Sequence, residues 1–326
     1  MKFIDAHCHL NSRSKAKMEL ALERGAAFVS INTDIPFFEP LAAQESVVLD
    51  LKQAYPDQVR YMGSFESKGF GSASWQTKTL DRIKQTVDNG ASGIKIWKNF
   101  GMAIKDDTGQ FVMVDDERLD PVFDFMAQNG LPMIGHIGEP KNCWLPLEEM
   151  TVDSDRRYFS NHSDYHMYLH PEYPSYQAHI DARDAVLSKH PSLIFVGAHL
   201  GSLEWNLDEV ALRLDKFPNF HTDLAERVCH VQLQSIADRE KVRQFFIKYQ
   251  DRIIYGSDVI DFNYRTEHQV ASRFEFLWDY HLKYFGSSEI LTAEEFEGSF
   301  QGLDLPQEVI QKIFITNAAN IYGFKI

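Results

Sequence analysis

Short apolar runs rich in β-branched residues alternate along the chain with longer segments whose apolar positions recur at helical spacing. Eight such runs predict β-strands, at residues 2–6, 27–32, 59–65, 93–97, 132–136, 193–198, 219–223 and 252–256. The intervening segments predict helices, at residues 14–24, 43–54, 75–89, 116–129, 176–189, 203–217 and 238–249. Strands that alternate with helices form a parallel sheet, and eight of them close a barrel. The pattern therefore predicts an α/β fold, a (β/α)8 TIM barrel.

An open doubly wound sheet is the competing architecture. That fold usually carries a glycine-rich phosphate-binding turn after its first strand, and the segment after Leu10 has none. Glycine or proline often stands where a predicted helix passes to a strand, as at Gly25, Gly90 and Pro218, which is typical of helix ends. These boundaries favour the regular repeat of the barrel.

Two segments depart from that repeat. Residues 138–174, after the fifth strand, are too many for an ordinary βα loop and are crowded with Trp, Tyr, His and Pro, so we expect an insert that acts as a lid or binding loop. From Arg265 onward the pattern predicts a long aromatic helix, a polar segment and a last helix from Gln307. No repeat, low-complexity tract or linker interrupts the sequence, which predicts one domain over residues 1–326.

Composition narrows the classes of function. Of the 326 residues, 44% are hydrophobic and 25% are charged, which is ample for the core of a large α/β domain. The formal net charge of -14 argues against binding to nucleic acid or to an anionic membrane, and leaves a small-molecule substrate as the expected partner. Three widely spaced cysteines, no run of about 18 apolar residues and no signal peptide before the first strand favour a cytoplasmic protein.

Two histidines, His7 and His9, close the first predicted strand in the stretch FIDAHCHL. Side chains two positions apart share a face of a strand. The alternation predicts one face carrying Phe3, Asp5, His7 and His9 and another carrying Ile4, Ala6 and Cys8. Two neutral imidazoles that converge are half of a metal site, although a pair of hydrogen-bonded histidines at a strand end would give the same pattern.

Other predicted strands also end in chemically active residues, and in a parallel barrel such ends collect at one face. The residues concerned are Lys95, Trp97, His136, His199 and Asp258. Each alone has a plain explanation, such as a satisfied core histidine, an ion-paired lysine or a helix N-cap aspartate. Together they would leave several unpaired polar groups in one pocket, which is costly unless a cation or a hydrogen-bond network joins them. We therefore predict a metal centre at this face.

Six stretches in order, DAHCHL, GIKIWKN, MIGHIGEP, FVGAHLGS, YGSDV and NAANIYGF, resemble the amidohydrolase superfamily. The resemblance is closest to its amidohydrolase-2 branch, which contains hydrolases and amino-carboxymuconate-semialdehyde decarboxylase, and it implies a TIM barrel. It also implies that one divalent metal is bound by His7, His9, His136 and Asp258. His199 then resembles the histidine that orients or polarises the substrate and the water. If Lys95 is carboxylated, as in other members of the superfamily, a second metal is expected.

Imidazole and carboxylate ligands suit Zn²⁺ best, with Mn²⁺, Fe²⁺, Co²⁺ and Ni²⁺ as alternatives. The resemblance leaves two reactions open. The first is hydrolysis of a small lactone, ester or amide, in which metal-activated water attacks a carbonyl, Asp258 takes the proton and His199 polarises the carbonyl. The second is non-oxidative decarboxylation of a small unsaturated or aromatic acid. We favour hydrolysis over decarboxylation, and a barrel that binds metal without catalysis is a third hypothesis.

Substrate-binding candidates flank this centre. Trp97 and Lys98 follow the fourth strand, Arg227 follows the seventh in TDLAER, and Arg157 lies in the insert. An arginine holds a carboxylate with its planar fork, so we expect a polar or anionic substrate, although each of these residues also suits packing or a surface ion pair.

Two further features concern the insert and the C-terminal helix. The histidines at positions 162, 166 and 170 would share a helix face, but the proline and aromatic content of the insert favours a lid over a second metal site there. The aromatic helix at residues 274–284 suggests a homodimer contact.

Overall fold

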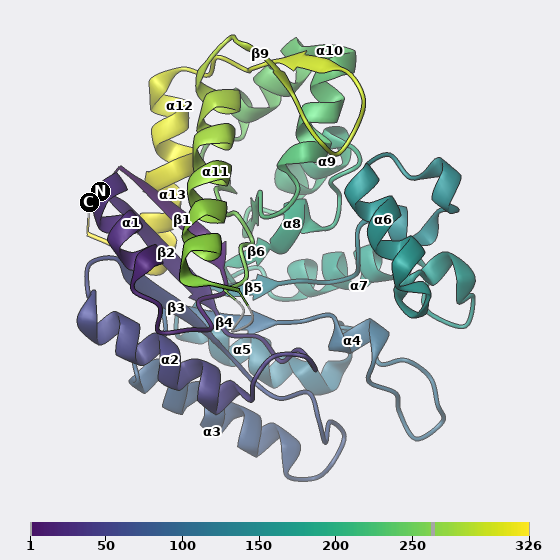
Figure 1. The fold of residues 1–326 in the computed structure, drawn as a ribbon. Helices are drawn as coiled ribbons and strands as arrows, with labels where there is room; N and C mark the ends of the chain where they lie inside the picture. The colour runs from purple at the N-terminus through teal and green to yellow at the C-terminus, as the bar shows by residue number, and fades with distance from the viewer. Residues whose placement is uncertain (1, 262–264, 326) are drawn as a thin grey trace.

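Eight parallel strands follow one another in chain order around a single sheet in the computed structural model, which describes residues 2–261 and 265–325 (Figure 1). The strands are β1 (Phe3–Cys8), β2 (Ala26–Ile31), β3 (Val59–Ser64), β4 (Gly93–Ile96), β5 (Met133–Gly135), β6 (Phe195–Gly197), β7 (Phe220–Asp223) and β8 (Ile253–Ile254). Each strand pairs in parallel with the next, as Ile94 of β4 does with Met133 of β5. An order from β1 to β8 without a crossover is the order of a barrel.

The first strand and the segment at the end of the last strand close the cylinder through their backbones. The Ala6 N–H donates to the Tyr255 carbonyl at 3.0 Å, and the Asp258 N–H donates to the His7 carbonyl at 2.7 Å. These bonds pair the two outer edges of the sheet with each other. The predicted TIM barrel is therefore confirmed, and the closure brings the polar ends of β1 and β8 side by side.

The helices surround these strands. They are α1 (Ala16–Arg24), α2 (Leu41–Ala54), α3 (Trp75–Asp88), α4 (Asn99–Met102), α5 (Asp120–Gln128), α6 (Asp153–Asn161), α7 (Tyr176–Lys189), α8 (Ala198–Gly201), α9 (Leu207–Lys216), α10 (Val228–Lys248), α11 (Glu267–Gly286), α12 (Gln307–Gln311) and α13 (Asn317–Tyr322). A short antiparallel hairpin, β9 (Ile290–Thr292) and β10 (Ser299–Gln301), follows α11.

One predicted helix starts in the wrong place. The sequence pattern predicts a helix from residue 238, whereas α10 begins at Val228. Asp238 leaves the helical backbone conformation, with φ -155°, and its carboxylate accepts a hydrogen bond from the Lys241 N–H at 3.0 Å. This is the geometry of an N-cap. The signal at Asp238 is therefore a second helix start inside a longer helical segment.

Alternate strand residues contribute to two separate apolar layers. Residues that face the barrel interior form one buried cluster with α13, including Ile4, Val29, Val196 and Tyr322. The other layer lies between the strands and the surrounding helices. Burying one large apolar side chain in such a layer contributes about 1.5–3 kcal/mol to stability. The strands are thus apolar on both faces, which is why they appear as continuous hydrophobic runs in the sequence.

The predicted alternation of β1 is wrong. Phe3 and Asp5 face the helix layer: the Phe3 ring lies 4.8 Å from that of Trp278, and the Trp278 indole N–H donates to Asp5 Oδ2 at 2.8 Å. The pairing of β1 with β2 shifts register between Asp5 and Cys8. Such an irregularity moves the following side chains to the other face. His7 therefore points into the barrel mouth, on the opposite side from Asp5.

The aromatic helix for which a dimer contact is predicted is α11. Phe274, Trp278 and Tyr284 are fully buried against the rest of the chain, whereas Phe276 is exposed. The Phe28 ring on β2 lies 5.1 Å from that of Phe274. Most of the aromatic pattern therefore belongs to the core of the monomer, and homodimerisation through this helix stays a prediction.

The segment between β5 and α7 folds into α6 and several short 3₁₀ turns that stand out from the body of the barrel (Figure 1). Four of its residues form a small core of their own, namely Cys143, Met150, Phe159 and Met167. This segment corresponds to the predicted insert at residues 138–174.

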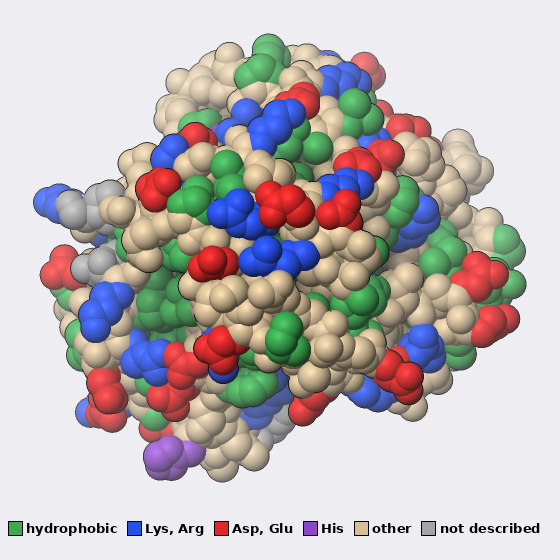
Figure 2. All heavy atoms as spheres, turned by 90° about the horizontal axis from the view of Figure 1, so that it is seen from above, with side chains coloured by type: hydrophobic (Ala, Val, Ile, Leu, Met, Phe, Trp, Pro, Cys, Tyr) green, Lys and Arg blue, Asp and Glu red, His purple; other side chains and the backbone are tan. Residues whose placement is uncertain are grey.

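The surface carries charges of both signs. The face drawn in Figure 2 shows basic and acidic side chains interspersed among apolar ones. Across residues 2–261 and 265–325, every helix is too short or too polar to cross a lipid bilayer.

Candidate metal centre

His7 is held by a buried carboxylate that the sequence analysis did not single out. Nδ1 of His7 donates to Oδ2 of Asp223, at the end of β7, over 2.7 Å. The other oxygen of Asp223 accepts a hydrogen bond from the backbone N–H of His199 at 2.8 Å. Burial acts to raise the pKa of Asp223, but its contacts with His7 outweigh this effect and hold that pKa below its usual value. With Nδ1 of His7 as the donor, Nε2 is a lone pair when the ring is neutral.

His9 and His199 are oriented in the same way, by backbone carbonyls. Nδ1 of His9 lies 2.7 Å from the Ile31 carbonyl oxygen, and Nδ1 of His199 lies 3.0 Å from the Ala225 carbonyl oxygen. A carbonyl only accepts, so each Nδ1 carries a proton and each Nε2 is a lone pair when the ring is neutral. Burial lowers the pKa of both rings, to about 3 for His199, so both rings are neutral at pH 7.

Side chains from four strand ends converge at this point. Nε2 of His7 and Nε2 of His9 each lie 3.4 Å from Oδ1 of Asp258. Nε2 of His199 lies 3.2 Å from Nδ1 of His136. One ligand atom from each of His7, His199 and Asp258 lies within 4.8 Å of the other two. The five polar residues predicted to form the centre are thus brought together.

This donor set fits a divalent cation. Three imidazole lone pairs meet Oδ1 of Asp258, which has no hydrogen-bond partner among the described residues. An ionised carboxylate facing lone pairs is unfavourable unless a cation joins them. Nitrogen and oxygen ligands of this kind suit Zn²⁺ and the neighbouring transition metals.

Residues at the end of β4 line the same cavity. Lys95 is 1% exposed, its Nζ has no hydrogen-bond partner among the described residues, and burial lowers its pKa to about 8. The Trp97 ring lies 6.3 Å from the ring of His136. Lys98 forms an ion pair with Glu139, in the loop after β5. All three β4-end residues predicted for the site therefore lie at the centre, with Lys98 already paired.

Of the two arginines predicted to bind substrate, the structure brings one to the centre. Arg227, at the N-terminal end of α10, is buried and lines a cavity of about 440 Å³ that also reaches the metal centre. Its Nε has no hydrogen-bond partner among the described residues. Arg157 is exposed and lines neither of the cavities described at the barrel mouth. Asp155 and Phe159 form the buried face of α6, and Arg157, two positions from each, points the other way.

The innermost cavity has a volume of about 180 Å³ and an aromatic outer wall. Phe37, from the loop after β2, and Tyr158 and Tyr165, from the segment between β5 and α7, form part of this wall together with Trp97. No sequence signal points to Phe37 or to either tyrosine, because only the fold brings their loops to the barrel mouth. The tyrosines support a binding role for the segment at residues 138–174.

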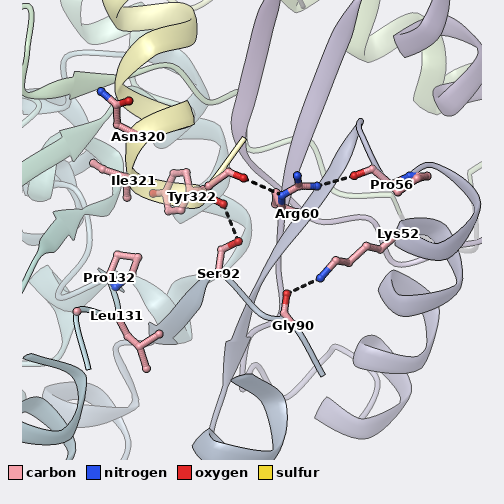
Figure 3. Close-up of a pocket in the computed structure, with 12 residues that line it drawn as sticks. Lys52, Pro56, Arg60, Gly90, Ser92, Leu131, Pro132, Asn320, Ile321 and Tyr322 are labelled. Atoms are coloured by element: carbon pink, nitrogen blue, oxygen red, sulfur yellow. Dashed lines mark hydrogen bonds between the residues drawn. The ribbon is translucent and has the colours of Figure 1, made fainter. Parts of the chain in front are cut away.

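A third cavity, of about 550 Å³, opens at the opposite end of the barrel (Figure 3). Its polar groups bind the backbone: Nζ of Lys52 donates to the Gly90 carbonyl at 2.5 Å, and Oγ of Ser92 donates to the Tyr322 carbonyl at 2.8 Å. Residues at this end of a TIM barrel stabilise the fold, whereas catalytic groups lie at the carboxyl ends of the strands. We therefore place the functional site at the histidine cluster.

Comparison with known proteins agrees with this placement. The family model described as amidohydrolase matches residues 4–324. A comparison with curated protein sequences found no match. Among solved structures, an uncharacterized TIM-barrel protein from Bordetella bronchiseptica shares 16% identity and a TM-score of 0.57 over 98% of each chain.

Two enzymes of known reaction have a similar fold. The 2,6-dihydroxybenzoate decarboxylase from Rhizobium shares 12% identity and a TM-score of 0.55 over 99% of this chain and 98% of that one. The 4-oxalomesaconate hydratase from Rhodopseudomonas palustris shares 12% identity and a TM-score of 0.51 over 98% of this chain and 95% of that one. Identities this low establish the fold alone, whereas the family match spans almost the whole sequence. The chain therefore belongs to the amidohydrolase family, in its amidohydrolase-2 branch.

Proposed function

We propose that the protein is a metal-dependent hydrolase of a small lactone, ester or amide. The observation that carries the proposal is the Asp258 carboxylate, whose Oδ1 has no hydrogen-bond partner among the described residues and lies 3.4 Å from Nε2 of both His7 and His9. The Asp258 side chain is 14% exposed, against 1% and 6% for the two histidines. Water in the cavity therefore reaches this carboxylate, which suits it as a proton acceptor.

His7, His9, His136 and Asp258 are the proposed ligands of one divalent ion, with Zn²⁺ as the preferred identity. Such an ion lowers the pKa of water from about 15.7 towards about 7, which makes a nucleophile available at neutral pH. Nζ of Lys95 is buried and has no hydrogen-bond partner among the described residues. If Lys95 is carboxylated, it would hold a second ion together with His136 and His199.

Asp258 and His199 have separate roles in the proposed reaction. Asp258 takes a proton from the attacking water and passes it to the leaving group. His199 orients that water through Nε2, in place of the contact that this atom makes with Nδ1 of His136 at 3.2 Å. The bond from Nδ1 of His199 to the Ala225 carbonyl keeps Nε2 unprotonated in the neutral ring. Polarising the substrate carbonyl, the other role predicted for His199, would need a proton on Nε2, which burial of the ring opposes. The geometry supports the orienting role.

The cations around the cavity favour a substrate that bears a carboxylate. Lys98 is already paired with Glu139. Arg227 forms a 3.3 Å ion pair from Nη1 to Glu226, but its Nε has no hydrogen-bond partner among the residues that the structure describes. Arg227 is therefore the better anchor for an anionic group. Trp97 supplies a flat wall, suited to a planar group near the reacting bond. We propose a small polar or anionic substrate with these two features.

Non-oxidative decarboxylation of a small unsaturated or aromatic acid is the second candidate. The observation that favours it is Lys95, a buried cation beside the centre whose Nζ has no hydrogen-bond partner among the described residues and would hold a carboxylate that is about to be lost. A structure of similar fold is that of a 2,6-dihydroxybenzoate decarboxylase with 2,6-dihydroxybenzoate bound.

Metal analysis and product analysis separate these proposals. The purified protein is assayed for metal content, and then with and without chelator against panels of lactones, esters, amides and aromatic acids. In water labelled with heavy oxygen, hydrolysis places the label in the product acid, whereas decarboxylation releases CO₂ from the substrate. An Asp258→Asn variant that keeps its metal and loses turnover supports the proton-transfer role. Normal turnover in that variant, or activity that survives metal removal, would overturn the mechanism.

A further inference from the structure

The space at the barrel mouth continues away from the metal centre, between α10 and α11. The cavity that reaches Arg227 has a volume of about 440 Å³. An adjoining cavity of about 290 Å³ shares with it the lining residues Cys229, Arg273, Leu277, His281 and Glu295. The two spaces therefore adjoin, and together we call them the arm, defined by the residues of these two cavities; its lining extends from Asp258 at the metal centre to Thr292 at the end of β9.

Two helices supply the long walls of this arm. On α10, Cys229 and Gln232 lie one helical turn apart, and on α11, Arg273, Leu277 and His281 recur every four residues. Each set therefore occupies one face of its helix. Phe274 and Trp278 pack on the barrel from another face of α11. On the face towards the arm Arg273 is exposed and Leu277 is half-buried, so these two side chains are accessible there.

Gln232 has an unused donor at the outer end of the arm. Its side chain is 1% exposed, and its amide nitrogen carries two N–H groups. The Tyr280 hydroxyl, which lines the same cavity, interacts with the Gln232 side chain and accounts for one of them, so one donor remains. Nε of Arg227, at the inner end, has no hydrogen-bond partner among the described residues. Buried donors of this kind are nearly always satisfied, by protein, water or ligand. The arm thus has a hydrogen-bond donor at each end, and a ligand that fills it should carry a hydrogen-bond acceptor at each end.

The charges along the arm decide which acceptor suits Gln232. The outer cavity is lined by Glu294 and Glu295, against one basic residue, Arg273, and the inner cavity also contains Glu226. A carboxylate beside Gln232 would face these glutamates, whereas a neutral carbonyl accepts from Nε2 without that repulsion. The outer subsite therefore favours an uncharged acceptor.

We propose that the outer part of the arm binds an uncharged carbonyl, such as that of an amide, at the far end of an elongated substrate, with Gln232 as the hydrogen-bond donor. The inference rests on the proposed metal-dependent function, because it places the reacting end of the substrate at the metal centre. It adds a substrate class to that function: an elongated molecule rather than a compact one. Gln232 determines specificity and takes no part in the chemistry.

Hydroxamic acids and metal-loaded protein test this arm, because a hydroxamate anchors one end of the ligand at a divalent metal. Straight chains of increasing length that end in a primary amide are compared by calorimetry with chains of equal length that end in a methyl group. At the chain length that brings the terminal amide to Gln232, the amide is expected to bind about tenfold more tightly than the methyl analogue. At shorter lengths the two ligands should bind with equal affinity. Gln232→Leu should abolish this gain, whereas Gln244→Leu, at an exposed position of the same helix, should keep it.

A second variant tests the passage itself. Cys229 lines both cavities, so the larger side chain of Cys229→Leu narrows the passage between them. The variant should bind long hydroxamic acids less tightly, whether they end in an amide or in a methyl group. Acetohydroxamic acid, which is short, should bind as it does to the wild type. The proposal is overturned if the terminal amide gives no gain at any chain length, or if the gain survives Gln232→Leu. Failure of acetohydroxamic acid to bind metal-loaded wild-type protein would instead contradict the metal centre, so the two failures are distinguishable.

Discussion

His7 and Asp223 form a buried pair in which Nδ1 of the histidine donates to Oδ2 of the aspartate over 2.7 Å. The two residues are 216 positions apart and stand on β1 and β7. The bond fixes the tautomer of His7 and turns its Nε2 towards Asp258. Asp223 also accepts a hydrogen bond from the backbone N–H of His199, so one carboxylate orients two histidines of the centre.

Asp223→Asn is expected to lower the affinity for metal by about 10–100-fold, the usual effect of losing a partner that orients a ligand. The neutral amide is a weaker acceptor for the Nδ1 proton and removes the negative charge that makes His7 a more basic ligand. Competition with a chelating dye measures the change. Asp251→Asn, at an exposed aspartate paired with Lys312, is the matched control and should bind metal as the wild type does. Equal affinities for the two variants would contradict the role of Asp223.

The barrel and its cluster of polar strand ends are predictable because their signals are local. Each strand is a short apolar run, and His136, His199 and Asp258 each follow such a run directly. Asp223 is the last residue of β7, but an aspartate at a strand end also resembles a helix N-cap, and its partner lies at the other end of the chain. The sequence shows which residue ends a strand; it does not show which distant side chain that residue meets.

The errors in the prediction also have local causes. The alternation of β1 fails because the register shift between Asp5 and Cys8 cannot be seen in a run of apolar and polar letters. Arg157 was assigned to the site by its place in the long segment, whereas the buried face of α6 is set by Asp155 and Phe159. Without the helix boundaries, the side of the helix on which an arginine lies is undetermined.

Lys95 distinguishes a centre with one ion from a centre with two. Wild-type protein and Lys95→Met are both expected to contain one ion per chain by elemental mass spectrometry, because the proposed ligands are His7, His9, His136 and Asp258. Turnover of a carboxylate-bearing substrate should fall in the variant, since the buried ammonium group beside the centre is gone. Two ions in the wild type and one in the variant would show that a carboxylated Lys95 bridges two metals.

Arg227 should set the affinity for anionic substrates. A hydrogen bond to a charged group contributes about 1.5–3 kcal/mol, so Arg227→Met is expected to raise KM for a carboxylate-bearing substrate by about 10–100-fold. A neutral analogue of the same substrate should be nearly unaffected. Arg157→Met, which changes an exposed arginine outside the cavity, is the control and should leave KM unchanged. If KM rises similarly in both variants, or in neither, Arg227 is not the anchor of the anionic group.

His179 makes the fold sensitive to acid. This residue of α7 is 1% exposed, and neither ring nitrogen has a hydrogen-bond partner among the described residues. Its ring lies 5.6 Å from that of Trp144. Burial, with a smaller contribution from the charge of Lys98, lowers its pKa to about 4. The unfolded chain has a histidine pKa near 6.5 and therefore binds more protons between about pH 6.5 and 4, so stability falls as the pH falls through this range.

His179→Gln is expected to remove this part of the acid sensitivity. At pH 7 the variant should be less stable than the wild type, because a buried amide replaces a neutral ring that fits its site. Between pH 6.5 and 4 the difference in unfolding free energy should shift in favour of the variant by about 2–3 kcal/mol, since only the wild type must protonate a buried ring. Urea denaturation of metal-free protein at several pH values measures this difference in unfolding free energy. His162→Gln, at an exposed position, controls for the exchange of side chains. If the difference in unfolding free energy between His179→Gln and the wild type stays constant with pH, the burial of His179 does not govern the acid response.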